Sequence, residues 1–189
     1  QGSVGGTPYT VSVIVTDSVG LSTLEQVTIT VFETATSVGT PVCWMNVAGL
    51  DLGPGSDVTR RVLDEPGEHR TFQAGAISCG CILGDNGFVQ TTVDETTSNR
   101  MWGLSDANDQ GQHFSDILYA MFLQSNGQLS IYEEGGQAEG FNATAYASGD
   151  IMRIEVVGTS VHYLQNGVIV YTSTRLVSQS DYPLKFDIS

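Results

Sequence analysis

The sequence VHYLQNGVIVYTS, residues 161–173, is the stretch that decides the fold. At its centre, Asn166 and Gly167 form a two-residue turn signal, because both tolerate the positive φ angles that a type I′ turn requires. The residues on either side are mostly β-branched, aromatic or apolar, as is typical of strands. The stretch therefore predicts a β-hairpin with the cross-strand pairs Leu164–Ile169 and Tyr163–Val170.

Strand signals recur along the rest of the chain, whereas apolar residues at helical spacing are almost absent. Glycine, asparagine, aspartate and serine separate the apolar runs, and SNGQ and GDNG are further turn signals. This spacing of many short strands is typical of a β-sandwich. We expect an all-β chain with strands near residues 42–50, 58–63, 70–83, 87–93, 100–105, 116–124, 128–132, 138–145, 150–157 and 184–188, in addition to the hairpin.

The segment 1–33 carries two strand patterns of its own, YTVSVIVT at 9–16 and VTITV at 27–31. A two-stranded hairpin alone is marginally stable in water, so we expect other strands to complete it. The pattern resembles the last two strands of PKD and cadherin-like repeats, which implies a partial Ig-like segment. Residues 34–41 are small and polar with Gly and Pro, and we expect them to form a linker.

Charge and hydropathy exclude several classes of function. The formal net charge is −14, from 21 acidic and 7 basic residues. Nucleic acids and anionic membranes are recognised by basic surfaces, so neither is an expected partner. No apolar run reaches the roughly 18 residues of a membrane-spanning helix. The start, QGSVGGTPYT, lacks the basic and apolar regions of a signal peptide, and we expect the chain to be a piece of a longer protein.

The block 42–189 carries further motifs in a fixed order. They are CWMNVAGLDL, FQAGAISCGCIL, NRMWGLSD, DILYAMFLQSNGQLSIYEEG, YASGDIMRIEVVG, the opening stretch, and YPLKFDIS. This order resembles the concanavalin A-like (lectin/glucanase, SPRY-like) module of extracellular surface proteins. The resemblance implies an extracellular jelly-roll β-sandwich, although a fold alone does not fix a ligand. The family usually continues with a final strand after the last motif, so we expect either a truncated end or a strand from a partner.

The three cysteines allow more than one arrangement. Cys43 can pair with Cys79 or with Cys81 if their strands are neighbours, and the odd number excludes full internal pairing. Buried thiols are the alternative, while a lone C-x-C offers too few ligands for structural zinc. The sequon NAT makes Asn142 a candidate glycan acceptor if the protein is secreted by a eukaryote.

Catalysis is not indicated by the acidic residues. Glucanases of this superfamily carry E-x-D-x-x-E on one strand, which places the paired carboxylates on one face. Asp94 and Glu95 are adjacent, as are Glu133 and Glu134, and adjacent strand residues point to opposite faces. No G-x-S-x-G nucleophile motif occurs. We therefore expect no enzyme, with a polysaccharide hydrolase as a minor alternative.

The loop GLSDANDQGQHFSD is the best candidate for binding chemistry. Asp106, Asn108 and Gln110, followed by a glycine, imitate the start of a calcium loop, in which a tight turn presents several oxygens to the ion. Glutamine replaces the usual acid and no bidentate glutamate follows, so a polar loop that caps strands is the other interpretation. Trp102 precedes the loop, and either a sugar stacks on its ring beside Asp106 and Asn108 or the ring belongs to the core.

These features predict a non-catalytic extracellular structural or adhesive protein, a modular subunit of a cell-surface fibre, appendage or adhesin. The expected partners are neighbouring copies or other domains of a larger surface assembly, because exposed strand edges are templates for pairing with other chains. A glycan-binding lectin module is the alternative. No cofactor is expected apart from calcium at the loop that Asp106 begins.

Overall fold

The computed structural model describes residues 7–16, 22–31, 42–53, 58–60, 74–106 and 113–189. The chain divides into two units, Gln1–Thr40 and Pro41–Ser189, and each is described by itself. In the first unit, β1 (Thr7–Thr16) and β2 (Ser22–Val31) form an antiparallel hairpin. Its assignment to an Ig-like repeat stays a prediction, and the expected linker lies outside the described residues.

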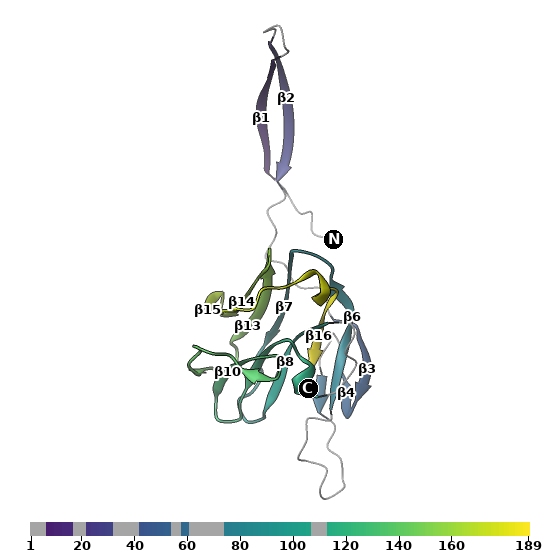
Figure 1. Ribbon diagram of the computed structural model, residues 1–189, viewed down its shortest axis with the longest axis vertical. Coiled ribbons are helices and arrows are strands. Elements are labelled where there is room, and N and C mark those ends of the chain that lie inside the picture. The colour runs from purple at the N-terminus through teal and green to yellow at the C-terminus, as the bar shows by residue number, and fades with distance from the viewer. Residues whose placement is uncertain (1–6, 17–21, 32–41, 54–57, 61–73, 107–112) are drawn as a thin grey trace, which may run out of the picture. The chain divides into compact units, whose positions relative to one another are not determined.

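Two antiparallel sheets form the sandwich of the second unit (Figure 1). In spatial order the larger sheet contains β11 (Gly136–Gln137), β10 (Gln128–Glu133), β9 (Tyr119–Leu123), β8 (Arg100–Asp106), β16 (Leu184–Ile188), β6 (Gly75–Ile82) and β3 (Trp44–Ala48), with β12 (Thr144–Ala145) paired to β10. The smaller sheet contains β15 (Val168–Thr172), β14 (Ser160–Gln165), β13 (Ile151–Val157) and β7 (Asn86–Thr92).

The other described elements are short. They are the strand pair β4 (Leu50–Leu52) and β5 (Val58–Arg60) and the 3-10 turns η2 (Phe114–Asp116) and η3 (Gln179–Asp181). No helix among the described residues is long and apolar enough to span a membrane. The architecture confirms the expected all-β fold class with a jelly-roll type of sandwich.

Alternate side chains of β13 and β14 form one half of the core. On these two strands the inward-facing residues are at most 1% exposed, and they are Met152, Ile154, Val156, Val161 and Tyr163. The larger sheet supplies the other half, which includes Leu104, Tyr119, Met121, Leu129 and Ile131. Because successive side chains in a strand point to opposite faces, Ile151, Arg153 and Glu155 lie on the outer face.

Tyr163 also joins the two sheets by a polar contact. Its hydroxyl on β14 donates to Glu133 Oε1 at the end of β10, at 3.0 Å. Burial, together with the negative charge of Glu133, raises the pKa of this tyrosine well above its ordinary value. The phenol therefore stays a neutral donor, and the most buried ring of the smaller sheet has a partner for its polar atom.

The β14–β15 hairpin confirms one expected cross-strand pair and corrects the other. Leu164 lies opposite Ile169, as predicted, but Tyr163 lies opposite Tyr171. The register shifts between these two pairs because Val170 is an extra residue on β15, which makes a β-bulge. The prediction of regular pairing through the whole hairpin was therefore wrong at Val170.

The strand expected over residues 138–145 is not formed. Only β11 and β12 are present, one on each side of a loop. Gly140 in this loop has a φ of +79°, a left-handed conformation that extended strands do not contain. Ala138 and Phe141 are buried in the core, so the apolar pattern there reflects packing of a loop.

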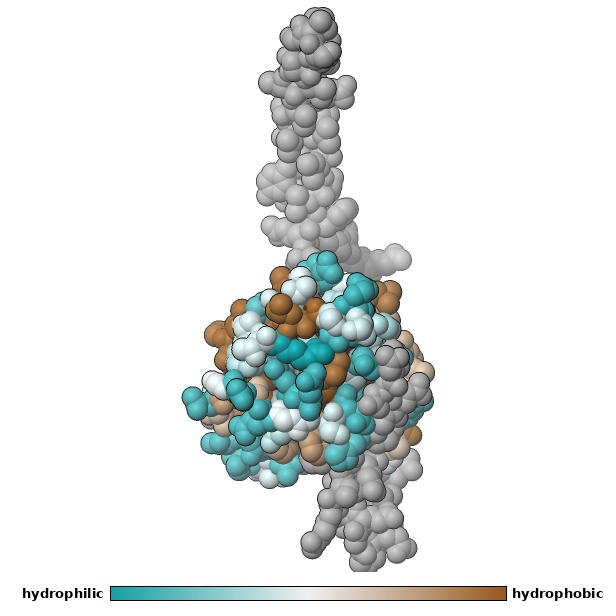
Figure 2. Space-filling view, in the orientation of Figure 1, coloured by the Kyte–Doolittle hydropathy of each residue, from teal (hydrophilic) through white to brown (hydrophobic). Residues whose placement is uncertain are grey.

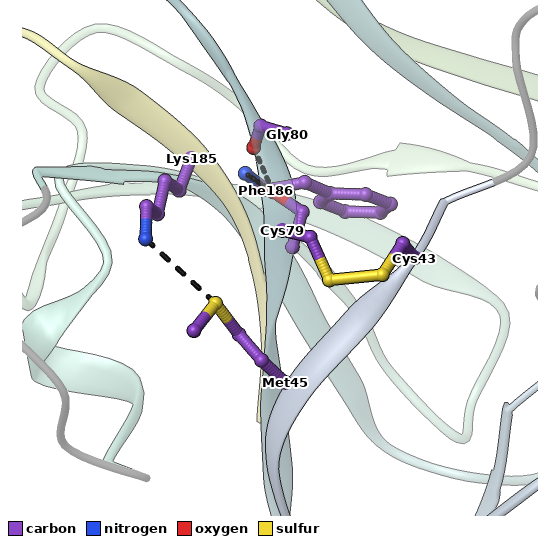
Figure 3. The surroundings of a disulfide bond; sticks show 7 residues. Cys43, Met45, Cys79, Gly80, Lys185 and Phe186 are labelled. Atoms are coloured by element: carbon purple, nitrogen blue, oxygen red, sulfur yellow. Dashed lines mark hydrogen bonds between the residues drawn. A yellow bond between two sulfur atoms is a disulfide. The ribbon is translucent and has the colours of Figure 1, made fainter.

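A disulfide bond fastens the edge strand β3 to its neighbour β6 (Figure 3). Cys43, which precedes β3, is bonded to Cys79, and their Cα atoms are 5.3 Å apart. Trp44 lies opposite Ser78, and the Cys79 N–H donates to the Cys43 carbonyl at 2.7 Å, so the register brings the two cysteines together. Cys81 is an exposed free thiol. Of the arrangements left open by the sequence, the structure has the Cys43–Cys79 pair.

Replacing Cys43 by Ser should lower the free energy of unfolding by about 2–4 kcal/mol, because the bond restricts the unfolded chain. The sequence separation of the bonded residues is 36. Urea unfolding of the oxidised protein measures the loss. Cys81→Ser is the matched control and should leave stability unchanged, since this thiol is outside the bond. Equal losses in the two variants would contradict the pairing.

The backbones of β8 and β9 approach each other closely at Gly103. This glycine lies opposite Ala120 in the register. A Cβ built on Gly103 would overlap the carbonyl oxygen of Tyr119 and lie 2.8 Å from the Cα of Ala120. Side-chain atoms do not approach backbone this closely without displacing it. The contact explains why a glycine stands in the middle of a buried strand.

Gly103→Ala should therefore lower the free energy of unfolding by about 1–3 kcal/mol, as overpacking does in other cores. Gly80→Ala is a suitable control, because a Cβ on Gly80 of β6 would meet no atom within 4 Å. Denaturant unfolding of both variants provides the measurement. A Gly103→Ala protein as stable as the control would show that β8 and β9 separate at little cost.

Candidate functional site

Trp102 lies in the core. It is 4% exposed and meets Phe186 edge-on, with ring centroids 5.6 Å apart. β8 is a central strand, and its residues from Met101 to Ser105 are buried on both faces of the sheet. The ring therefore has no exposed face on which a sugar could stack. In the structure Trp102 is a core residue.

The other predicted ligands of the polar loop are only partly described. Asp106 ends β8, is half-buried and lies opposite Leu184 of β16. Asn108 and Gln110 lie outside the described residues, so calcium binding stays a prediction. Within the described ranges, no group of three or more His, Cys, Asp or Glu side chains is arranged to hold a metal ion.

Asn142 is exposed in the loop between β11 and β12. Its amide is therefore open to solvent, as a glycan acceptor on a folded protein must be. Glycosylation of Asn142 stays a prediction.

Arg175 ties the β15–β16 connection to the larger sheet. Its guanidinium donates to both carboxylate oxygens of Asp181 at 3.0 Å, to Glu134 at 2.8 Å and to the Tyr119 hydroxyl. Burial raises the pKa of Tyr119 to about 12, although the Arg175 cation opposes the shift. These contacts occupy most of the guanidinium donors, so the cluster holds a loop in place.

Asp150 holds the turn of the β14–β15 hairpin. Its carboxylate accepts from the Ala147 N–H at 2.9 Å and from the side chains of Gln165 and Asn166, each at 2.8 Å. The hydrogen bond from Asn166, followed by that from Ala147, lowers the pKa of Asp150. Asn166 and Gly167 have φ angles of 53° and 79°, as a type I′ turn requires. The YASGD motif therefore serves to hold the hairpin turn in place.

Large apolar side chains are exposed beside this turn. The carbonyl of Ile151, the first residue of β13, accepts from the Asn166 N–H at 2.7 Å, which places it next to the hairpin. β15, which begins directly after the turn, is an edge strand of the smaller sheet. We call this group the hairpin patch, and its members are Ile151 (41% exposed), Val168 (66%) and Ile169 (50%). Val168 and Ile169 are successive residues of β15 and point to opposite faces of the sheet.

Three connections meet at one end of the sandwich (Figure 1), and a second group of exposed apolar residues lies in or beside them. The Gly158 N–H in the β13–β14 turn donates to the Asp85 carbonyl in the β6–β7 connection at 2.6 Å. The Val177 N–H in the β15–β16 connection donates to the Thr159 carbonyl at 2.8 Å. Figure 2 shows hydrophobic residues gathered at this end of the sandwich. We call this surface the tip patch, and its members are Leu83 (76% exposed), Val157 (50%) and Leu176 (59%).

The two patches lie at opposite ends of one strand. Ile151 is the first residue of β13 and Val157 is the last. At about 3.3 Å per residue, they are roughly 20 Å apart. Sequence reasoning missed both patches, although Ile151 and Val157, apolar at the two outward-facing ends of IMRIEVV, were a signal that this strand is apolar on more than its buried face.

No protein-family model and no curated protein matches the chain. Among solved structures it is similar to the TRIM65 PSpry domain, with a TM-score of 0.52 and 14% identity over 78% of this chain and 83% of that chain. It is also similar to stonustoxin, with a TM-score of 0.51 and 9% identity over 78% of this chain, and the match spans 26% of that chain.

A third solved structure, the alginate lyase AlgAT5 from polysaccharide lyase family 7, gives a TM-score of 0.43 at 10% identity, over 73% of this chain and 68% of that chain. The similarity to this lyase is too low to support a conclusion about the fold or function of the chain. The first two likenesses establish the β-sandwich fold, with a SPRY domain among the neighbours, and nothing about chemistry.

Replacing Asp150 by Asn should lower the melting temperature at pH 7, because the ionised carboxylate accepts three hydrogen bonds. Its folded pKa lies below the ordinary value of 3.8. The stabilisation is therefore fully present above that value and is lost as the pH falls through the folded pKa. Thermal unfolding followed by circular dichroism should show the difference between wild type and variant shrinking toward pH 2.

The matched control for Asp150 is Asp85→Asn, which removes the same charge from an exposed position. It should leave the melting temperature at pH 7 almost unchanged. If the deficit of the Asp150 variant were constant across the whole pH range, the ionised carboxylate would not be its cause.

Proposed function

We propose that this chain is a non-catalytic, extracellular structural or adhesive module, a subunit of a cell-surface fibre, appendage or adhesin. The observation that carries the proposal is the exposure of large apolar side chains in the hairpin patch and the tip patch. Contiguous exposed apolar surface on a folded domain is typical of protein interaction sites. Function in this proposal resides in contacts with other protein surfaces.

The disulfide supports an extracellular location. Cys43 and Cys79 are bonded, and such bonds persist in oxidising compartments and are rare in the cytosol. The net charge of −14 also fits an exposed surface protein, because a strong charge of one sign opposes non-specific clumping.

The acidic pairs support a non-catalytic role, because structural contacts already occupy them. Glu133 accepts from Tyr163, and Glu134 accepts from Arg175. Asp94 and Glu95 both form ion pairs with Arg100. Hydrolysis of a glycosidic bond needs two carboxyl groups on either side of the substrate. These four groups instead hold turns and sheet ends together.

The lectin alternative loses its main candidate residue, because Trp102 is buried. Sugar sites need an exposed aromatic face together with polar groups that are free to bind hydroxyls. A glycan-binding role would show itself as a saccharide-specific signal in the experiment below.

Beads that carry the full chain should cluster, because many weak protein contacts add up on a multivalent surface. Light scattering measures the clusters, and excess oligosaccharide should not disperse them. A glycan array should give no saccharide-specific signal, and incubation with a panel of polysaccharides should release no product. A reproducible glycan hit, polysaccharide turnover or beads that stay separate would each overturn the proposal.

A further inference from the structure

We infer that Asn166 is a modification site, where spontaneous loss of the side-chain amide releases the hairpin turn from Asp150. Asparagine followed by glycine is the sequence most prone to deamidation, because glycine has no Cβ to shield its backbone nitrogen. The chain contains three such pairs, Asn86–Gly87, Asn126–Gly127 and Asn166–Gly167. The contacts of each glycine N–H and of each asparagine amide distinguish the three pairs.

Deamidation needs only the chain and water. The backbone nitrogen of the glycine attacks Cγ of the asparagine, so that an N–C bond forms and the Cγ–Nδ2 bond breaks. The amide nitrogen takes up the proton of the glycine N–H and leaves as ammonia. Water then opens the resulting cyclic imide at either of its carbonyls. One product is aspartate, and the other is isoaspartate, in which the main chain runs through the side-chain carbon.

The glycine nitrogen of the pair on β7 is held in the sheet. Gly87 lies opposite Val156 in the β7–β13 register. Two residues earlier, the Asp85 carbonyl accepts from the Gly158 N–H at 2.6 Å. Hydrogen-bonded pairs alternate along antiparallel strands, so the Gly87 N–H is directed at the Val156 carbonyl. Attack on Asn86 would break this hydrogen bond.

The other two glycine nitrogens differ from each other. The Gly127 N–H donates to the Gln124 carbonyl at 2.9 Å, which opposes attack on Asn126. Among the described residues, no hydrogen bond engages the Gly167 N–H. Gly167 is exposed, and a Cβ built on it would meet no atom within 4 Å. Of the three nitrogens, that of Gly167 is therefore the one available for attack.

Two hydrogen bonds restrain the side chain of Asn166. Its Oδ1 atom accepts from the Ile151 N–H and its Nδ2 atom donates to Asp150 Oδ1, each at 2.8 Å. The hydrogen bond from Asn166 lowers the pKa of Asp150, so the acceptor is a carboxylate at neutral pH. Rotation of Cγ toward the Gly167 nitrogen must break both bonds. We call this pair of bonds the Asn166 clamp, and the reaction proceeds from turns in which the clamp is open.

Deamidation removes the donor that the clamp needs. Aspartate at position 166 would place a second carboxylate where Nδ2 now lies 2.8 Å from Asp150. Two carboxylates at this distance repel each other, and neither can donate. Isoaspartate also adds a carbon to the backbone of a two-residue turn, whose geometry depends on its length. The modified turn therefore stays open, and deamidation acts as a one-way switch on the turn that connects the edge strand β15 to β14.

Incubation of the folded chain at neutral pH, followed by digestion and mass spectrometry of the peptides, compares the three pairs directly. In urea all three asparagines should deamidate at similar rates, because each precedes glycine. In the folded wild type all three should be slow. Asp150→Ala should accelerate deamidation of Asn166 several-fold and leave Asn86 and Asn126 slow. Circular dichroism confirms that the variant is folded at the temperature of incubation.

Glu139→Gln is the matched control, because it removes one negative charge from an exposed position outside the clamp. It should leave all three rates as they are in the wild type. Equal rates at Asn166 in the wild type and in Asp150→Ala would show that the clamp does not control the reaction. Faster deamidation of Asn86 or Asn126 than of Asn166 in Asp150→Ala would show that the glycine nitrogen does not select the site. Either result would overturn the inference.

A substitution that imitates the product tests the switch independently of the deamidation rate. Asn166→Asp should lower the melting temperature at pH 7 by about 3–8 °C, because a hydrogen bond to a charged group is lost. Combining it with Asp150→Asn exchanges donor and acceptor and should restore most of the loss. The asparagine oxygen would still accept from Ala147 and Gln165, as Asp150 Oδ2 does now. A single variant as stable as the wild type, or a double variant no more stable than Asn166→Asp, would show that deamidation does not act through the clamp.

Discussion

The packing of β13 and β14 against the larger sheet is the contact on which the other features of the sandwich depend. Alternate residues of β13 must be buried to form the core, and Met152, Ile154 and Val156 fill that place. The period of the strand then forces the residues between them outward. Ile151 and Val157 are exposed for this reason. The same constraint thus produces the core and one member of each apolar patch.

Two polar clusters hold the connections that carry the patches. Arg175 binds Asp181 and Glu134, which positions the connection with Leu176. Asp150 binds Asn166, which fixes the turn that precedes Val168. Burial tends to raise the pKa of Asp181, but hydrogen bonds from Arg175 and from the Ser178 N–H lower it below its ordinary value. These charged groups therefore hold the surface connections in fixed positions.

Much of the fold could be predicted from the sequence, because strand period and turn chemistry act locally. The Asn166–Gly167 turn, the pair Leu164–Ile169 and the strands over 100–106, 128–133 and 184–188 are each indicated by a pattern of residues close together in the sequence. The bulge at Val170 could not be predicted in this way, since register is decided by packing across sheets.

The candidate sites were harder to predict, because they depend on the position of a strand in its sheet. Trp102 lies on a strand that is buried on both faces, and the sequence does not say which strands are central. The choice of Cys79 over Cys81 depends on the register between β3 and β6. β13 has apolar residues on both faces, and Val157 is exposed because the opposite face packs into the core. The sequence alone does not say which face is buried.

The bulge in β15 has a consequence for how this protein avoids amyloid-like growth. The strand VIVYT is apolar, rich in β-branched residues and lies at a sheet edge, and such strands recruit further strands by templating. The extra residue Val170 interrupts the regular spacing of backbone donors and acceptors and increases the local twist. An incoming strand cannot pair along the whole edge. The bulge therefore opposes extension of this sheet by a strand of another chain, which is the step by which cross-β aggregates grow.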